Sequence, residues 1–128
     1  MFKKVSILGS TGSIGSNTFK IIDKKKSFFK VELLSANKNY KSICTQIRKY
    51  KPKFFLINNN NIYLKVKKKY KRNKKKILKN IDELEKNFKC DLAICAIPGL
   101  AGLKPTLQMV KVSKKVLIAN KESIICGW

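Results

Sequence analysis

The sequence predicts an open α/β domain in which a parallel sheet carries helices on both faces. One observation is that short apolar runs of strand length alternate with longer segments whose apolar residues recur at helical spacing. Another is that a glycine-rich segment follows the first apolar run and leads directly into the first of these helices. The 128 residues are enough for one domain with a buried core.

The first strand, turn and helix form the unit around which the domain is organised. Residues 5–8 are an apolar strand, residues 9–15 carry three glycines in the spacing G-x-x-G-x-x-G, and residues 17–22 are amphipathic. Glycines let a pyrophosphate approach the backbone, and the N–H groups and positive dipole at the start of a helix attract it. The hydroxyls of Ser10, Thr11 and Ser13 are expected to add donors. The alternative is a strand-to-helix turn that binds no ligand.

The rest of the chain continues the alternation of strand and helix. Further strands are expected at residues 31–36, 54–57, 76–78, 91–97 and 116–119, and further helices at residues 39–51, 81–88 and 102–111, with a surface helix after residue 62. The order strand–helix–strand builds a parallel sheet with right-handed crossovers. We therefore expect a Rossmann-like, doubly wound sheet over residues 1–128, truncated at its C-terminal end.

Two segments carry more specific expectations. The continuous apolar run 91–97 is expected in the middle of the sheet, buried on both faces. In the helix 102–111, Leu103, Leu107 and Val110 are expected to face the core, and Pro105 is tolerated in the first turn.

Composition excludes several classes of enzyme and leaves one further class open. The chain has no histidine, so it cannot by itself form a Ser-His-Asp triad, a Cys-His pair or a histidine zinc site. The four cysteines form no C-x-x-C pair and are expected to be reduced and buried. No apolar run approaches the roughly 20 residues that span a bilayer, which favours a cytoplasmic protein without a membrane segment.

The formal charge of +23 invites a comparison with nucleic-acid-binding proteins. Nearly all of the cations are lysines, with Arg48 and Arg72 the two arginines, and aromatic residues do not gather among them. We interpret the excess as solvated lysine-rich surface, which makes nucleic acid an unlikely partner. The alternative is a nucleic-acid-associated protein that uses residues 65–79, whose binding would collapse with salt.

The segment after the second strand predicts which dinucleotide would bind. NAD-specific sites hold an Asp or Glu there for the adenosine ribose, but residues 35–39 contain no acid. Lys38, with an amide on each side, suits the additional 2′-phosphate of NADP(H). The alternative is that Lys38 is one more surface lysine.

Three segments together resemble one enzyme family. Residues 8–15, 96–106 and 119–123 (LGSTGSIG, AIPGLAGLKPT and ANKES) are similar to the N-terminal, NADPH-binding part of 1-deoxy-D-xylulose 5-phosphate reductoisomerases. The resemblance implies an oxidoreductase of non-mevalonate isoprenoid biosynthesis. This enzyme rearranges 1-deoxy-D-xylulose 5-phosphate and reduces the product with NADPH, using Mg²⁺ or Mn²⁺, to 2-C-methyl-D-erythritol 4-phosphate.

The resemblance also assigns roles to particular residues. It implies that the cofactor is held by Thr11, Gly12, Ser13, Ile14, Asn37, Lys38, Asn39, Asn120 and Glu122, and that Lys121 contacts the sugar-phosphate substrate. Asn37 replaces a glycine that is common in the family, and Pro98 replaces an apolar residue and removes an N–H donor. The catalytic loop and the metal-binding carboxylates of the family lie beyond this sequence, so we expect no catalytic residue or metal ligand here. The fragment is expected to be inactive alone, and the full-length enzyme is expected to be a homodimer.

A competing interpretation keeps the fold and changes the chemistry. Other NADP-linked enzymes, such as semialdehyde dehydrogenases, have a similar first turn and a downstream nucleophilic cysteine. Cys126 has the position for that role, but apart from Lys121 nothing near it in the sequence would lower its pKa.

Overall fold

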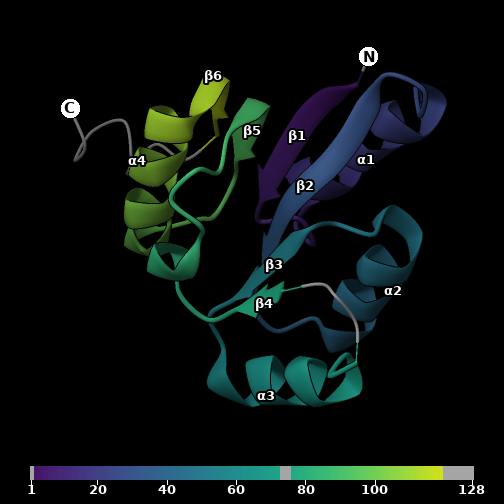
Figure 1. The fold of residues 1–128 in the computed structure, drawn as a ribbon, viewed down its shortest axis with the longest axis vertical. Helices are drawn as coiled ribbons and strands as arrows, with labels where there is room; N and C mark the ends of the chain where they lie inside the picture. Colours follow the sequence, from purple (N-terminus) through teal and green to yellow (C-terminus); the bar gives the residue numbers. More distant parts are fainter. Residues whose placement is uncertain (1, 73–75, 120–128) are drawn as a thin grey trace.

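The computed structural model describes residues 2–72 and 76–119 and contains one parallel sheet of six strands (Figure 1). The strands are β1 (Lys3–Leu8), β2 (Phe29–Ala36), β3 (Phe54–Ile57), β4 (Lys76–Leu78), β5 (Cys90–Cys95) and β6 (Ser113–Ile118). The helices are α1 (Ser13–Lys24), α2 (Tyr40–Tyr50), α3 (Asn60–Lys69) and α4 (Leu103–Val112), with single 3₁₀ turns η1 (Ile81–Glu83) and η2 (Leu100–Gly102). The predicted parallel α/β class is confirmed.

The sheet order is β4-β3-β2-β1-β5-β6. The chain winds outward from β1 through β2 and β3 to β4, and then returns to the other side of β1 to form β5 and β6. The order therefore reverses between β1 and β5, and this reversal is the switch point of a doubly wound sheet. Loops that leave the carboxyl ends of β1 and β5 separate there, which opens a crevice for a ligand.

The sheet has an apolar core on each face. On one face α1, α2 and α3 pack over the strands through side chains such as Phe19, Ile47 and Val66. On the other face α4 and the segment after η1 pack through Met109, Leu84 and others. Helices thus cover both faces, because strands buried on two sides carry apolar residues at successive positions.

The segment 81–88 was expected to be a helix, and this prediction was wrong beyond its first turn. Asn80 caps η1 by accepting a hydrogen bond from the N–H of Asp82 at 3.1 Å, but Leu84 is already extended at φ −62° and ψ 135°. The extended chain lets both Leu84 and Phe88 reach the sheet, where Phe88 meets the ring of Phe54 edge-on at 5.9 Å between centroids. Tertiary packing overrides the local helical pattern at this point.

The predicted inward face of α4 was also wrong. Pro105, Thr106 and Met109 are buried, whereas Leu107 and Val110 are 39% and 40% exposed. The helix is rotated by about one position from the expected orientation, because its neighbours on that face are β5, β6 and η1. Pro105 does lie in the first turn, as predicted.

The other predicted elements agree with the structure within a few residues. β5 lies between β1 and β6 but ends at Cys95 rather than at residue 97, with Ala93, Ile94 and Cys95 buried. The described cysteines, Cys44, Cys90 and Cys95, are buried free thiols, as expected. In the described part of the chain, no helix combines the length and apolar character needed to cross a membrane.

Candidate nucleotide-binding site

A cavity of about 270 Å³ lies at the carboxyl ends of β1, β2, β3 and β5, at the switch point of the sheet. Its lining comes from four loops and consists of Gly9, Thr11, Gly12, Ser35, Ala36, Asn37, Asn58, Ala96, Ile97, Pro98 and Ala101. The apolar residues come mainly from the loop after β5, and the hydroxyl and amide groups come from the other three loops. Such a mixture suits a ligand with both a polar chain and an apolar ring.

Two of the three loop glycines are required by the packing of the protein itself. Gly9 has φ +83°, and a Cβ atom there would lie 2.7 Å from the carbonyl oxygen of Ala96. A Cβ atom on Gly15 would lie 2.5 Å from the carbonyl oxygen of Gly9 and 2.7 Å from the Cα of Ser10. Because glycine has no Cβ, the loop can lie close to the chain that follows β5, and α1 can lie close to the loop.

Gly12 differs from its two neighbours in the motif. A Cβ atom at Gly12 would meet the carbonyl oxygen of Gly9 at 3.6 Å, an ordinary contact, and the residue has φ −78°. No feature of the described protein therefore demands glycine at this position, which lines the cavity. A glycine that the fold does not need, at the mouth of a cavity, leaves room for a ligand to approach the backbone.

The N-terminus of α1 is open toward a ligand. Gly12 is the N-cap residue and cannot cap with a side chain, and the first turn carries no acidic side chain. Within the described residues, the N–H groups of Ser13, Ile14 and Gly15 have no hydrogen-bond acceptor, and the first helical bond runs from Ser16 to the carbonyl of Gly12 at 2.9 Å. Free N–H groups and the positive end of a helix dipole are the features with which proteins bind anions.

The loop before that helix is anchored from two directions. The carbonyl oxygen of Ser35 on β2 accepts the N–H of Gly9 at 3.0 Å and the N–H of Ser10 at 2.7 Å. The buried Ser10 hydroxyl donates to Oε1 of Gln46 on α2 at 2.6 Å. The expectation that this hydroxyl serves a phosphate is therefore wrong, because the hydroxyl is buried and already bonded to protein, while Thr11 is half-buried and Ser13 is exposed.

The loop after β2 places the predicted adenosine-side residues beside the cavity. Asn37 lines the cavity, and Lys38 and Asn39 are exposed directly after it. Asn39 caps α2 by accepting the N–H of Ser42 at 3.1 Å, which leaves its amide NH₂ group as a donor. In the described chain the one non-glycine residue with positive φ is Lys51, so Asn37 adopts its place without that kind of backbone strain.

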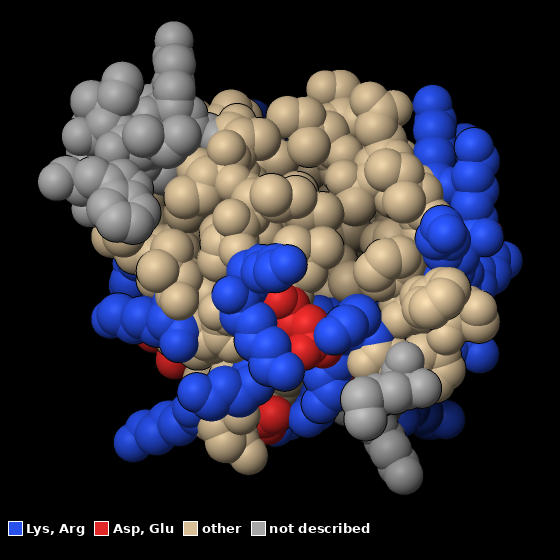
Figure 2. All heavy atoms as spheres, turned by 90° about the horizontal axis from the view of Figure 1, so that it is seen from above, with Lys and Arg blue, Asp and Glu red and all other residues tan. Residues whose placement is uncertain are grey.

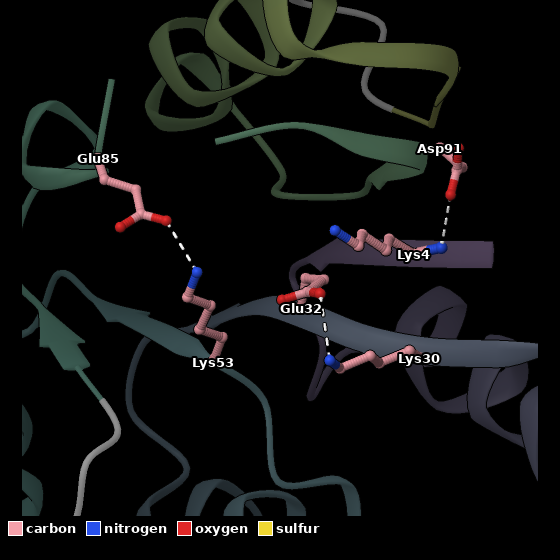
Figure 3. A network of polar contacts seen from close by, with 6 residues as sticks. All are labelled: Lys4, Lys30, Glu32, Lys53, Glu85 and Asp91. Carbon is pink, nitrogen blue, oxygen red and sulfur yellow. Dashed lines mark hydrogen bonds and ion pairs between the residues drawn. The ribbon is translucent and has the colours of Figure 1, made fainter. Parts of the chain in front are cut away.

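The cavity lining is free of acidic side chains among the described residues. Six of the seven acidic residues are described, and none of them lines the cavity. Figure 3 shows Asp91 accepting the backbone N–H of Lys4 at 2.8 Å, and Glu85 accepting from Lys53 at 2.9 Å, both near the amino ends of strands. The backbone N–H of Lys4 and the ammonium of Lys114 hold the pKa of Asp91 below its usual range. The described lining of the cavity is therefore without a carboxylate that would repel a phosphate.

The positive charge is unevenly distributed on the face seen in Figure 2. On this face, basic side chains surround a small group of acidic side chains, and a broad area carries no charged groups. Described ion pairs such as Lys49–Asp23 at 2.9 Å involve a few of the lysines, and the net charge of +23 is what remains after every acid is counted. Such a positive surface raises the general affinity for anions.

Neither a metal site nor a reactive thiol is assembled in the described chain. Residues 2–72 and 76–119 hold no group of three or more Cys, Asp or Glu side chains that could bind a metal ion. The residues present therefore do not fit a divalent cation, and we assign no step to one. Burial raises the pKa of Cys95 to about 11, so this thiol near the cavity stays protonated at neutral pH. Cys126 lies outside the described residues.

The structure brings together part of the predicted site. Thr11, Gly12 and Asn37 line one cavity, with Ser13 and Ile14 following in the first turn of α1. The predicted residues Asn120, Lys121 and Glu122 lie outside the described residues. Asn58 lines the cavity but was not predicted from the sequence, although its position directly after a predicted strand places it at the carboxyl edge of the sheet. Gln46 was not assigned a role either, because its hydrogen-bond partner Ser10 is 36 residues away in the sequence.

The fold and the loop define an open, doubly wound α/β domain of the class that binds nucleotides at the carboxyl edge of its sheet. The family can be named as well, since the family model of 1-deoxy-D-xylulose 5-phosphate reductoisomerase matches residues 5–127. The chain therefore belongs to this family, and the resemblance noted from three segments of the sequence is confirmed.

Individual relatives agree with the family assignment. The chain is 48% identical over 130 residues to the reductoisomerase of Pelagibacter ubique, and 42% identical over 131 residues to that of Buchnera aphidicola. These matches cover 98% of this chain but 34% and 33% of the two relatives. The chain thus spans about a third of the length of the curated relatives it matches.

Solved structures match the fold over the same part. The reductoisomerase of Zymomonas mobilis, solved in complex with NADPH, superposes with a TM-score of 0.86 at 31% identity, over 98% of this chain and 34% of that one. A reductoisomerase solved with NADPH, fosmidomycin and magnesium gives a TM-score of 0.83 at 26% identity, over 96% of this chain and 31% of that one.

Proposed function

We propose that residues 1–128 form an NADPH-binding domain of a 1-deoxy-D-xylulose 5-phosphate reductoisomerase. The observation that carries the proposal is the uncapped N-terminus of α1, which opens at Gly12 beside a cavity whose described lining holds no carboxylate. An anionic dinucleotide with its pyrophosphate over this terminus and its remaining groups in the cavity meets those requirements. Similarity to a relative solved with NADPH supports the same ligand.

The residues of the proposed site divide the cofactor between them. The N–H groups and hydroxyls of Thr11 to Ile14 bind the pyrophosphate, and Asn37, Lys38 and Asn39 bind the phosphorylated adenosine. An ammonium group at Lys38 and the absence of an acid in the loop after β2 favour the 2′-phosphate over a free 2′-hydroxyl. Asn120 and Glu122 are proposed to contact the cofactor as well, and Lys121 the sugar phosphate.

The activity of the whole protein is part of the same proposal. NADPH supplies the hydride when it is bound, and this chain binds it and orients it, with a described cavity lining that presents no carboxylate to it. The rearrangement and reduction of 1-deoxy-D-xylulose 5-phosphate, the Mg²⁺ or Mn²⁺ site and a homodimer are assigned to the longer enzyme, in the cytoplasm. The relatives solved with magnesium support the metal requirement of that enzyme.

The test is a calorimetric titration of the purified chain with NADPH, NADH and a single-stranded oligonucleotide, each at low and at physiological salt. We expect tighter binding of NADPH than of NADH at both salt concentrations, with Lys38→Ala reducing the difference and the exposed Lys20→Ala serving as a charge-matched control. Oligonucleotide binding that collapses with salt, together with no binding of NADPH, would favour the nucleic-acid alternative. With 1-deoxy-D-xylulose 5-phosphate and Mg²⁺ or Mn²⁺ added, the chain alone is expected to oxidise no NADPH.

A further inference from the structure

Gln46 on α2 makes a buried, two-way contact with the glycine-rich loop. Its Oε1 accepts the hydroxyl of Ser10 at 2.6 Å, and its Nε2 donates to the carbonyl oxygen of Ser10 at 3.0 Å. Gln46 is 8% exposed and Ser10 is fully buried. The two residues are 36 positions apart, so the contact joins the loop after β1 to the second helix of the fold.

The core does not need an amide at this place. Gln46 lies on the buried face of α2 beside Ile43 and Ile47, both of which are buried apolar residues. Burying an amide there is costly unless both of its polar atoms are bonded, as they are here. A leucine would fill similar volume without that cost, so packing alone does not account for a glutamine.

The contact fixes the direction of a peptide group that faces the site. The carbonyl of Ser10 and the N–H of Thr11 belong to one planar, trans peptide unit and therefore point in opposite directions. Because Gln46 holds that carbonyl, the N–H of Thr11 points away from α2, and Thr11 lines the cavity. The neighbouring N–H groups of Gly9 and Ser10 are already bonded to Ser35.

We infer that Gln46 is a positioning residue that orients the Ser10–Thr11 peptide, so that the backbone of the glycine-rich loop is prepared for the pyrophosphate of the cofactor. The inference rests on the proposed NADPH-binding function and adds to it a residue outside the cavity. The pyrophosphate part of the ligand depends on this peptide, whereas the phosphorylated adenosine is bound by the loop after β2. Loss of Gln46 is therefore expected to affect the two parts of the ligand differently.

The test compares Gln46→Leu with the wild-type chain in titrations with NADPH and with adenosine 2′-monophosphate, which lacks the pyrophosphate. We expect NADPH affinity to fall about tenfold, the equivalent of one lost hydrogen bond to a charged group, and adenosine 2′-monophosphate affinity to stay within about twofold. Gln108→Leu, the same exchange at a half-buried position on α4, is the control and should leave both affinities unchanged. Ser10→Ala keeps the Nε2 contact and is expected to weaken NADPH binding by about threefold, less than Gln46→Leu does.

Each other outcome counts against a specific statement. NADPH affinity that is unchanged in a folded Gln46→Leu chain, or in Ser10→Ala if the leucine variant does not fold, would overturn the positioning role. Equal losses for both ligands would also overturn it, since they indicate a general loss of the native state. A wild-type chain that binds neither ligand would instead overturn the proposed function, and the inference with it.

Discussion

Alanine substitutions at Gly15 and at Gly12 are expected to affect different properties of the protein, although both residues belong to the same motif. At Gly15 the new Cβ would lie 2.5 Å from one backbone oxygen and 2.7 Å from two further backbone atoms of Ser10, none of which can rotate away. At Gly12 the single contact would be 3.6 Å long. Gly15→Ala is therefore expected to damage the fold, and Gly12→Ala the binding of the ligand.

The magnitudes follow from the two environments. Overpacking against backbone costs about 3 kcal/mol at Gly15, and alanine recovers at most about 1 kcal/mol of helix propensity, so the net loss of stability is about 2 kcal/mol. At Gly12 the weaker N-cap preference of alanine is offset by the smaller entropy of its unfolded chain, which leaves a change within about 0.5 kcal/mol. The methyl group of Gly12→Ala would stand where the phosphates approach, so we expect about tenfold weaker NADPH binding.

The assays are urea unfolding followed by circular dichroism, and calorimetric titration with NADPH. Gly99→Ala separates strain from steric clash, because Gly99 has φ +75° and a Cβ atom there would meet nothing within 4 Å. That variant is expected to lose about 2 kcal/mol of stability, because φ +75° with ψ −174° is a conformation that essentially only glycine adopts. If Gly12→Ala unfolded as easily as Gly15→Ala, or bound NADPH as tightly as the wild-type chain, the assignment of Gly12 to the ligand would be refuted.

Three further predictions concern stability and reactivity. Lys51→Gly is expected to raise the free energy of unfolding by about 0.5–1 kcal/mol in urea titrations, because Lys51 ends α2 at φ 47°; an unchanged midpoint would contradict this. A hydrogen bond from Lys49 holds the pKa of Asp23 below its usual range. Asp23→Asn is therefore expected to be less stable than the wild-type chain at pH 7, and this difference should disappear as the pH falls below about 4 and the carboxylate becomes protonated. A stability difference that persists at pH 2 would show that the carboxylate charge is not its cause. Cys95 is buried and its pKa is raised to about 11, so it should not react with iodoacetamide at pH 8 until urea is added. Mass spectrometry of peptides measures the labelling. Rapid labelling of the native chain would show that the thiol is accessible.

The sequence is sufficient to locate the strands and the first glycine-rich turn. An apolar run of four residues such as 54–57 is typical of a strand that is buried on both faces of a sheet, and β3 is found at Phe54–Ile57. Glycines at fixed spacing after a strand indicate positions with positive φ or with backbone atoms too close for a Cβ. Gly9 has positive φ, and both Gly9 and Gly15 have backbone atoms that close. These features depend on neighbours along the chain, and for that reason a single sequence reveals them.

Tertiary structure decided the features that depend on contacts distant in sequence. The periodicity of 102–111 predicts a helix, but burial of Met109 rather than Leu107 depends on how β5, β6 and η1 pack around it. The segment 81–88 forms a single 3₁₀ turn and then an extended chain instead of a helix, and Phe88 packs against Phe54. The buried pair of Ser10 and Gln46 has no local signal at all, because a hydrogen bond across 36 residues exists only after two elements have packed together. Local patterns fix the elements and the turn, whereas the buried face of each helix and the partners that hold the loop are fixed by the free energy of packing the whole chain.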